Sequence, residues 1–307
     1  MTEVVVAGET LVDFVPDSPR PLPEVESFTR RAGGAPANVA VALSRLGHHP
    51  RFDTRVGADA FGRFLADTLD AEGVGDHVQR DAERDTAVAF VSHAPGDDSF
   101  SFYRDDTADC HLDTTRVSSD ALDAAEWLVV GGVMLSAEPG RTAIFDLVER
   151  AREHDCRVAF DPNGRPALWE SKHERREVTD RALSASDLVV TSPDDLPWLP
   201  DAGFADAVLS AGPSAVAVTR GDAGAGLLTT DSSPWGETAV DHPGFDAAEV
   251  DATGAGDAFT AGLVVAILDD RDAESALAYA NACGAAAVTA RGAMPALPDR
   301  EAAESFL

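Results

Sequence analysis

Short runs of apolar residues alternate along the chain with longer segments in which apolar residues recur every three or four positions. The runs have the length of buried strands, and the longer segments have the spacing of helices. The predicted strands are Glu3–Gly8, Trp127–Gly131, Arg157–Asp161, Asp187–Thr191 and Ala215–Thr219, and the predicted helices are Ala37–Leu46, Phe61–Leu69, Arg141–Arg150, Arg175–Leu183, Asp257–Leu268 and Glu274–Arg291. Strands that alternate with helices predict βα units, so we expect an α/β fold with a mostly parallel sheet and helices on its faces.

Two stretches depart from this pattern, at about residues 11–31 and 86–108. The first is rich in proline, and within the second the residues Thr86–Arg104 alternate as antiparallel strands do. We expect them to form a small β-flap inserted in a single domain of residues 1–307, although they could instead extend the edge of the main sheet. Because they flank the first glycine-rich motif, they favour a lid over the site.

The charge of the chain is strongly negative. Asp and Glu total 54 against 24 Lys and Arg, which gives a formal net charge of −30 and a pI near 4.4, and Lys172 is the only lysine. The acidic residues occur in every segment, which indicates a solvated acidic shell rather than a binding tail. Such a shell is expected at very high ionic strength, because salt screens its self-repulsion. The sequence therefore predicts a halophilic protein of a potassium-rich cytoplasm, with neither nucleic acid nor an anionic membrane as partner.

The remaining composition predicts a cytoplasmic, soluble protein. The three cysteines Cys110, Cys156 and Cys283 are far apart and contain no CxxC motif, which is typical of reduced structural thiols. We expect no signal peptide and no membrane-spanning helix, since no apolar run approaches about 20 residues.

The segment Val250–Gly262 carries the most informative chemistry. Small residues lead into Thr253-Gly254-Ala255-Gly256, and Asp257 then opens an apolar helix. Small residues let the backbone pass close to a ligand, and the N–H groups at a helix N-terminus bind anions such as a phosphoryl group in transfer. Asp257 is then placed to accept a hydroxyl proton, although it could instead simply cap the helix.

A second glycine turn, Gly33–Ala40, also leads into a helix. Together the two segments resemble the two signatures of the ribokinase-like (PfkB) carbohydrate kinase family. The resemblance continues over nearly the whole chain, through Gly8-Glu9 to Asp13, Val56–Gly62, Thr219–Gly224 and the helix around Asn281–Gly284. It implies a three-layer ribokinase-like fold and an ATP-dependent kinase that phosphorylates a sugar hydroxyl.

The resemblance also implies a role for individual residues. Asp257 matches the catalytic base of the family, and Gly254, Ala255 and Gly256 match its anion hole. The positions that match the sugar-binding residues are Asp13, Gly33, Gly34 and Asn38. A carboxylate and an amide suit that role, because vicinal hydroxyls need both acceptors and donors.

Nucleotide and cation sites are implied in the same way. The positions that match the nucleotide-binding residues are Ser192, Thr219, Gly221, Gly224, Gly254, Gly256 and Asn281. Asn281 would lie near the adenine, but ordinary helix packing explains it equally well. Asp251 and Thr253 match positions that hold a monovalent cation in many relatives, which suggests K⁺ beside Mg²⁺ with ATP. Asp251 could instead cap the turn.

Some family features are replaced or missing. Many relatives carry an Asn-x-x-Glu element that organises magnesium, and here the corresponding stretch is Ser192-Pro193-Asp194-Asp195, which keeps a shorter carboxylate. The chain has no P-loop motif, which excludes a P-loop ATPase, and its glycines at 221, 224 and 226 do not form the dinucleotide-binding pattern.

The sugar is predicted from three further segments. Residues 160–169 and 102–104 resemble segments shared by fructokinases and 2-keto-3-deoxygluconate kinases, and they place Tyr103, Arg104, Asp161 and Arg165 among the substrate-binding candidates. The motif GGAPAN at 33–38 favours fructokinases. Against fructose, Arg104 and Arg165 could together clamp the carboxylate of a sugar acid.

Fructose is therefore the expected substrate, with 2-keto-3-deoxygluconate as the alternative. A sugar-binding regulator without catalysis is the alternative from another class, and the intact Asp257 argues against it. Relatives often dimerise through the flap, which suggests a homodimer.

Overall fold

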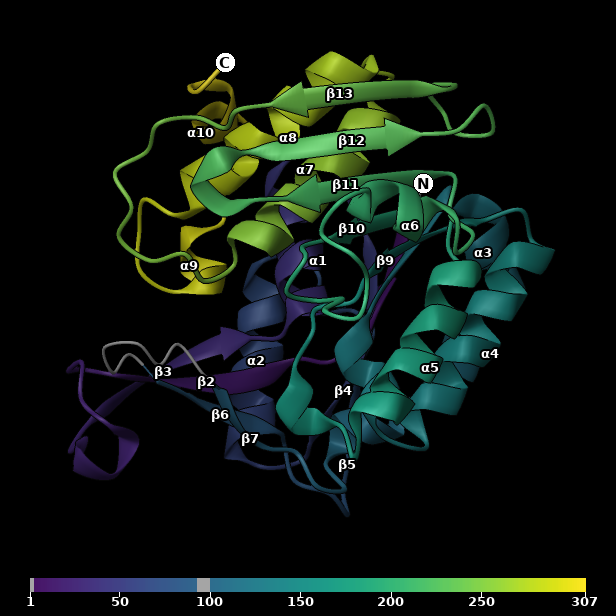
Figure 1. Cartoon of the computed structure of the whole chain (residues 1–307). Coiled ribbons are helices and arrows are strands. Elements are labelled where there is room, and N and C mark those ends of the chain that lie inside the picture. The colour runs from purple at the N-terminus through teal and green to yellow at the C-terminus, as the bar shows by residue number, and fades with distance from the viewer. Residues whose placement is uncertain (1–2, 93–99) are drawn as a thin grey trace.

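A computed structural model describes residues 3–92 and 100–307 of the chain. Within these residues nine strands form one large sheet, in the order β13-β12-β11-β10-β9-β8-β1-β4-β5 (Figure 1). The pairs from β5 to β11 are parallel, and β12 and β13 pair antiparallel at one edge. The bounds are Val4–Ala7 (β1), Arg51–Gly57 (β4), Val78–Asp81 (β5), Trp127–Gly131 (β8), Arg157–Asp161 (β9), Leu188–Thr191 (β10), Ala215–Thr219 (β11), Ala225–Thr229 (β12) and Thr238–His242 (β13).

Both faces of the large sheet are buried under helices. Along β1, Val4 and Val6 belong to one hydrophobic core, whereas Val5 and Ala7 belong to the other. Strands buried on both faces form continuous apolar runs rather than alternating patterns. This explains why the strands of the large sheet appear in the sequence as short apolar runs. The predicted α/β fold with a mostly parallel sheet is thus confirmed.

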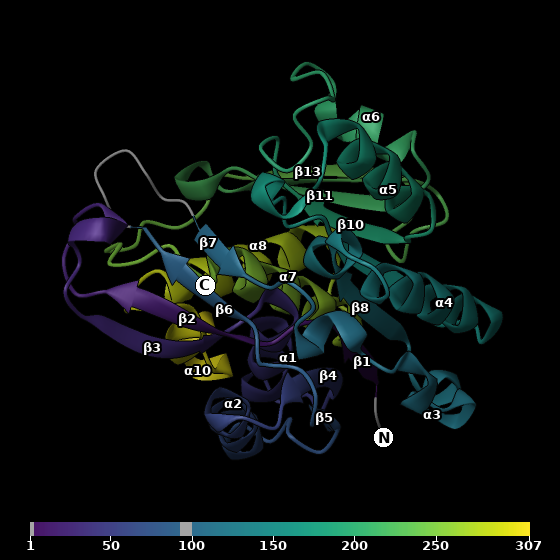
Figure 2. The same ribbon diagram turned by 90° about the horizontal axis from the view of Figure 1, so that it is seen from below.

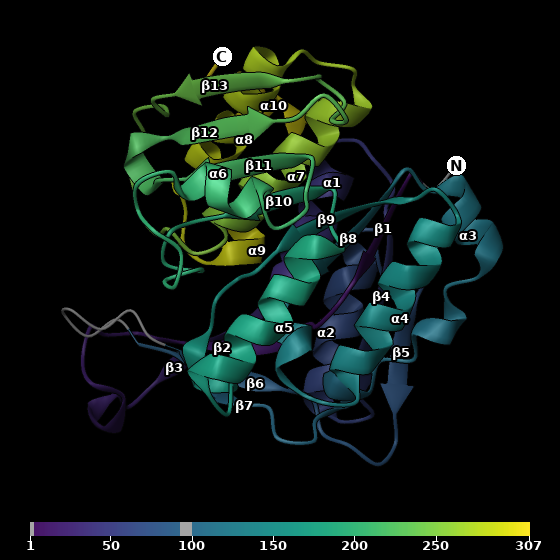
Figure 3. The ribbon, with the colours of Figure 1, turned by 45° about the vertical axis from the view of Figure 1, so that its right-hand side comes forward.

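The helices form the two outer layers (Figures 1 and 3). Helices α1, α2, α7 and α8 share one core with the sheet, and α4, α5 and α6 share the other. The bounds are Ala35–Arg45 (α1), Ala60–Ala71 (α2), Ser119–Ala124 (α3), Gly140–Glu153 (α4), Lys172–Ser184 (α5), Phe204–Leu209 (α6), Ala255–Leu268 (α7), Ala273–Ala287 (α8), Ala293–Ala296 (α9) and Arg300–Glu304 (α10). No helix in the described part of the chain is long and apolar enough to cross a membrane.

A second sheet has the order β3-β2-β6-β7 among the described residues. Three of its strands fall within the two segments that the sequence assigned to a small β-flap, and β3 extends two residues beyond the first segment, to Gly33. Residues 93–99 of that prediction lie outside the described residues. Figure 2 shows this small sheet as a separate layer to one side of the large sheet. The function of a lid stays a prediction. The bounds are Leu11–Pro16 (β2), Phe28–Gly33 (β3), Val88–Val91 (β6) and Phe100–Tyr103 (β7).

Helices α7 and α8 pack against each other closely because small residues face one another. A Cβ at Gly262 would lie 2.7 Å from the sulfur of Cys283, so only glycine permits this distance. Several predicted helix bounds need correction: α8 ends at Ala287 rather than at Arg291, and α7 begins at Ala255 rather than at Asp257. Helix α5 begins at Lys172 rather than at Arg175, α4 ends at Glu153 rather than at Arg150, and α1 begins at Ala35 rather than at Ala37.

Candidate active site

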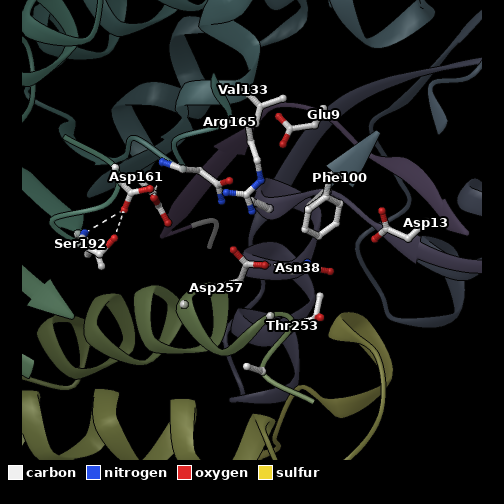
Figure 4. Close-up of a pocket in the computed structure, with 18 of the residues that line it drawn as sticks. Glu9, Asp13, Asn38, Phe100, Val133, Asp161, Arg165, Ser192, Thr253 and Asp257 are labelled. Atoms are coloured by element: carbon white, nitrogen blue, oxygen red, sulfur yellow. Dashed lines mark hydrogen bonds between the residues drawn. The ribbon is translucent and has the colours of Figure 1, made fainter. Parts of the chain in front are cut away.

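A cavity of about 370 Å³ lies where the parallel strands of the large sheet end. Ligands of open α/β sheets bind outside these carboxyl ends, and here β1, β8, β9 and β10 each send a following loop to the cavity, while β11 reaches it with its last residue, Thr219. The small sheet and the first turns of α1 and α7 complete the wall (Figure 4). The lining residues are Glu9, Leu11, Asp13, Gly34, Ala35, Asn38, Phe100, Phe102, Val133, Asp161, Asn163, Arg165, Val190, Thr191, Ser192, Asp195, Thr219, Ala252, Thr253, Gly254, Gly256 and Asp257.

The turn before α7 brings bare backbone to the cavity. Gly254 is the N-cap residue of α7 with a φ of 85°, and a Cβ on it would lie 2.9 Å from the Cα of Ala293. Both its conformation and its surroundings therefore require glycine. No side chain caps this end of α7. The N–H groups of the first turn and the helix dipole thus make the turn suitable for an anion.

Asp257 lies in the first turn of α7 and is 8% exposed. Its Oδ2 accepts a hydrogen bond from Nδ2 of Asn38 at 2.7 Å, so the carboxylate bonds another side chain rather than capping its own helix. Burial raises the pKa of Asp257 to about 6, against the lowering effects of Asn38 and of the positive charge of Arg165. At neutral pH the group is therefore mainly ionised, and it is a stronger base than an exposed aspartate.

Asn38 is positioned by the glycine turn at the start of α1. Gly34 is the N-cap residue of α1 with a φ of 103°, and a Cβ there would lie 2.6 Å from the carbonyl oxygen of Glu9. Asn38 is 4% exposed, and its Oδ1 has no partner among the described residues. One amide thus holds Asp257 and keeps an acceptor for a hydroxyl in the cavity.

Asp13 and Arg165 lie on other walls of the same cavity. Burial and the negative charge of Asp257 raise the pKa of Asp13 to about 7, against the lowering effect of Arg165. The guanidinium of Arg165 lies 5.2 Å from the ring centre of Phe100, and it also lowers the pKa of Asp257. Arg165 is thus the cation that partly balances the carboxylates of the cavity.

At the other end of the cavity, the loops after β9 and β10 bring together two carboxylates. Oδ2 of Asp195 accepts from the backbone N of Ser192 at 2.9 Å and from its Oγ at 2.7 Å, and Oδ1 accepts from the backbone N of Gly164 at 2.7 Å. The pKa of Asp161 is raised well above its usual value by burial and by the charge of Asp195. Two carboxylates that repel each other in this way suit a bound cation.

Asp251 caps the turn that precedes α7. Its Oδ1 accepts from the backbone N of Thr253 at 3.0 Å, and its Oδ2 accepts from the backbone N of Gly292 at 2.8 Å. The capping role that the sequence left open is therefore present. Thr253 itself lines the cavity.

Comparison with known proteins gives this geometry a family. The model of the pfkB family carbohydrate kinases matches residues 1–300. The chain belongs to this family of carbohydrate kinases. The kinase therefore has the enzyme class that its two glycine motifs predicted.

Individual relatives agree over the full length. Fructokinase-1 of Oryza sativa subsp. japonica is 38% identical, and the alignment covers 97% of this kinase and 95% of that protein. The fructokinase of Xylella fastidiosa with bound ATP is 30% identical with a TM-score of 0.87, covering 99% and 97% of the two chains. A double mutant of the Vibrio cholerae fructokinase with fructose, ADP and potassium ion is 32% identical with a TM-score of 0.86, covering 100% and 98%.

Two predicted substrate contacts, Tyr103 and Arg104, lie outside the lining of the cavity. Nε of Arg104 bonds Oδ2 of Asp109 at 2.5 Å, and its Nη1 donates to the carbonyl of Val133 and to Oγ of Ser136. Strand alternation places Tyr103 on the opposite face of the small sheet from Phe102, where it is 64% exposed. The predicted clamp of Arg104 and Arg165 on a carboxylate is therefore lost.

Six other predicted residues also lie outside the cavity lining, among them Asp251, described above, and Ala255, the first residue of α7. Gly33 supports it, because a Cβ there would lie 2.0 Å from Oδ2 of Asp13. Gly221 and Gly224 shape the turn after Thr219, with φ values of 59° and 78°. Asn281 is buried in α8 and donates to the carbonyl of Leu277 at 2.8 Å, which is the helix-packing alternative.

Several lining residues of the kinase were not among the predicted site residues. Glu9, Phe100, Phe102, Asn163 and Asp195 all line the cavity. Glu9, Asn163 and Asp195 follow the carboxyl ends of buried strands, which is a signal that the sequence carried. Phe100 and Phe102 are two positions apart on β7 and therefore lie on the same face of the small sheet. Which face that is depends on the register of the sheet.

Proposed function

We propose that the kinase phosphorylates a hydroxyl group of fructose with ATP, and that Asp257 is its general base. One observation carries the proposal: a buried, mainly ionised carboxylate lies at the N-terminus of α7 and faces a cavity lined by polar side chains that can donate and accept hydrogen bonds. The relatives support fructose, since fructokinases match nearly the whole chain.

The sugar lies between the small sheet and α1 in this mechanism. Asp13 and the free Oδ1 of Asn38 accept hydrogen bonds from its hydroxyls, and the backbone at Gly34 lets the ring approach closely. Asp257, oriented by Asn38, takes the proton from the attacking hydroxyl as the new O–P bond forms and the bond from the γ-phosphorus to the bridging oxygen breaks, so that ADP leaves. Asn38 thereby connects sugar binding to the orientation of the base.

The phosphoryl group lies above the first turn of α7. The N–H groups of the Gly254–Gly256 turn stabilise the charge that grows during the in-line transfer. The nucleotide extends toward Ser192 and the turn from Thr219 to Gly224. Asp195 and Asp161 would supply the oxygen donors that Mg²⁺ prefers, and the ion bound with ATP would neutralise phosphate charge there.

K⁺ is proposed beside this turn. The carboxylate of Asp251 and the hydroxyl group of Thr253 are hard oxygen donors beside the turn, which is the donor type that such a cation takes. Replacing K⁺ by tetramethylammonium at equal ionic strength should lower kcat. Identical activity in the two salts would remove the proposal.

The small sheet is proposed to close over the sugar and to form a homodimer interface. The face of the sheet that points away from the cavity carries a cluster of aromatic rings, Phe14, Phe28, Phe90 and Tyr103, with ring centres 4.9–5.6 Å apart. Analytical ultracentrifugation should detect a dimer that Tyr103→Asp weakens. A monomer at all concentrations would contradict this part.

A coupled assay of ADP release with Mg-ATP in molar KCl tests the substrate. Fructose should be phosphorylated with a higher kcat/KM than 2-keto-3-deoxygluconate. The sugar acid stays the second candidate because Arg165 lies in the cavity. A higher kcat/KM for the sugar acid would reverse the assignment, and absence of turnover with either would remove both.

A further inference from the structure

Glu9 is a buried carboxylate of the cavity that the mechanism above does not use. It follows β1 at the carboxyl edge of the large sheet and is 1% exposed. Figure 4 shows its side chain on the wall across the cavity from Asp257, beside Val133 and above Phe100. It therefore lies where the part of a sugar distant from the reacting hydroxyl would be.

One oxygen of Glu9 is without a partner. Its Oε2 has no hydrogen bond among the described residues, and a buried acceptor left in this state costs free energy. Burial raises the pKa of Glu9 to about 7, although the positive charge of Arg104 lowers it. A ligand that donates a hydrogen bond would remove this penalty, whereas a ligand that only accepts would not.

The neighbouring cation does not fill that role. The guanidinium of Arg104 is held by Asp109, by the carbonyl of Val133 and by Ser136. It lies behind the cavity wall, where its charge is paired with Asp109 at 2.5 Å. Among the described residues, Arg104 beside Glu9 is thus already paired, and the other cation of the cavity, Arg165, lies against Phe100.

We propose that Glu9 is a specificity residue that accepts a hydrogen bond from a hydroxyl of a neutral sugar and disfavours a carboxylate at the same place. The inference rests on the proposed function and names the substrate class of that site. An ionised carboxylate can only accept hydrogen bonds, so it selects a donor. A second carboxylate facing it would be repelled in a site with little water.

The test is a double-mutant cycle in which one change is a substitution of Glu9 and the other is the removal of one hydroxyl from the sugar. It is measured at about pH 8, where Glu9 is mainly ionised. kcat/KM is measured for fructose and a series of monodeoxyfructoses. Glu9→Met removes the acceptor, and Glu9→Gln keeps an acceptor without charge. In the unaltered kinase, removal of the hydroxyl bound by Glu9 should lower kcat/KM about 10- to 100-fold, the range of a hydrogen bond to a charged group. In Glu9→Met, removal of the same hydroxyl should lower kcat/KM less than about threefold. The decrease in Glu9→Gln should lie between those of the unaltered kinase and Glu9→Met.

Binding of a sugar acid provides the second readout. The inhibition constant of gluconate should fall about threefold or more in Glu9→Gln, since the repulsion is gone. Glu301→Gln, exposed on α10, is the matched control and should change neither readout. Melting temperatures of all variants separate a loss of fold from a loss of specificity.

The outcomes are distinguishable. The role of Glu9 is overturned if each deoxy sugar shows the same decrease in kcat/KM in all variants, or if the inhibition constant of gluconate is unchanged in Glu9→Gln. The kinase would remain a fructokinase in both cases. If the unaltered kinase does not phosphorylate fructose, the proposed function itself fails. A hydroxyl whose removal is costly only when Glu9 is present supports the inference.

Discussion

The hydrogen bond between Asn38 and Asp257 should control the pH at which the kinase becomes active. Nδ2 of Asn38 donates to Oδ2 of Asp257 at 2.7 Å and so lowers the pKa of the buried carboxyl group. The perturbation is Asn38→Leu, which has a similar size and no donor. Without the donor, burial acts with less opposition and the pKa of Asp257 rises above about 6.

The size of the effect follows from the energy of the bond. A hydrogen bond to a charged group contributes about 1.5–3 kcal/mol, and a pKa change of one corresponds to about 1.4 kcal/mol. The pKa of Asp257 should therefore move from about 6 to between about 7 and 8, and its ionised fraction at pH 7 should fall from ~90% to between ~50% and ~10%. The assay is kcat/KM for the sugar against pH, which reports the free enzyme.

The acidic limb of this profile is the decisive readout, because a lost sugar contact lowers kcat/KM at every pH without moving the limb. Asp13 titrates nearby, so the comparison is repeated in an Asp13→Asn background. Asn281→Leu removes another buried amide that donates to its own helix, and its limb should stay at about pH 6. An unchanged limb in Asn38→Leu would refute the role of this bond.

Three further predictions concern the turn, the buried acids and the surface. Gly254→Ala should lower kcat about 10-fold or more and lower the melting temperature, because the new Cβ would lie 2.9 Å from backbone atoms of Ala293. The control is Gly236→Ala, at a glycine with a φ of 67° and no neighbour within 4 Å among the described residues. It should lower the stability by only about 1 kcal/mol and leave the activity unchanged. Burial raises the pKa of Glu9, Asp13 and Asp257, so these three groups bind protons more tightly in the folded kinase than in the unfolded chain between about pH 4 and pH 7, and the stability they contribute is lost as pH rises. The melting temperature of the ligand-free kinase should consequently fall as pH rises through this window, and fall less when all three carboxyls are replaced by amides. Raising KCl from about 0.1 M to about 2 M should increase the melting temperature, since a formal net charge of −30 is then screened within a few ångströms; a decrease would contradict the inferred salt adaptation.

The large sheet was predictable because its strands are buried on both faces. Strands β1, β8, β9, β10 and β11 are continuous apolar runs, and all five were predicted. Strand β4 carries Arg51 and Asp53, which pair with each other, so its polar residues concealed it. The edge strand β13 is half exposed, and its sequence Thr238–His242 has no distinguishing pattern.

The site was predictable where backbone conformation dictates the residue. Gly34 and Gly254 cap helices in conformations that favour glycine, and such constraints leave a motif in the sequence. Tertiary packing, by contrast, decides whether a long side chain points into the cavity or away from it. Arg104 was expected to bind substrate, but Asp109, only five residues later, holds its guanidinium behind the wall. Glu9 was missed because a single acid after a strand is a weak signal before the strand order is known.

Asp257 is the central claim, and Asp257→Asn tests it most directly. The amide keeps the size of the side chain and cannot accept the hydroxyl proton. With saturating fructose and Mg-ATP, kcat should fall about 10²- to 10⁴-fold, the range that a general base supplies, while the melting temperature stays the same or rises. A variant that folds and keeps kcat within about threefold of the unaltered kinase would contradict the account.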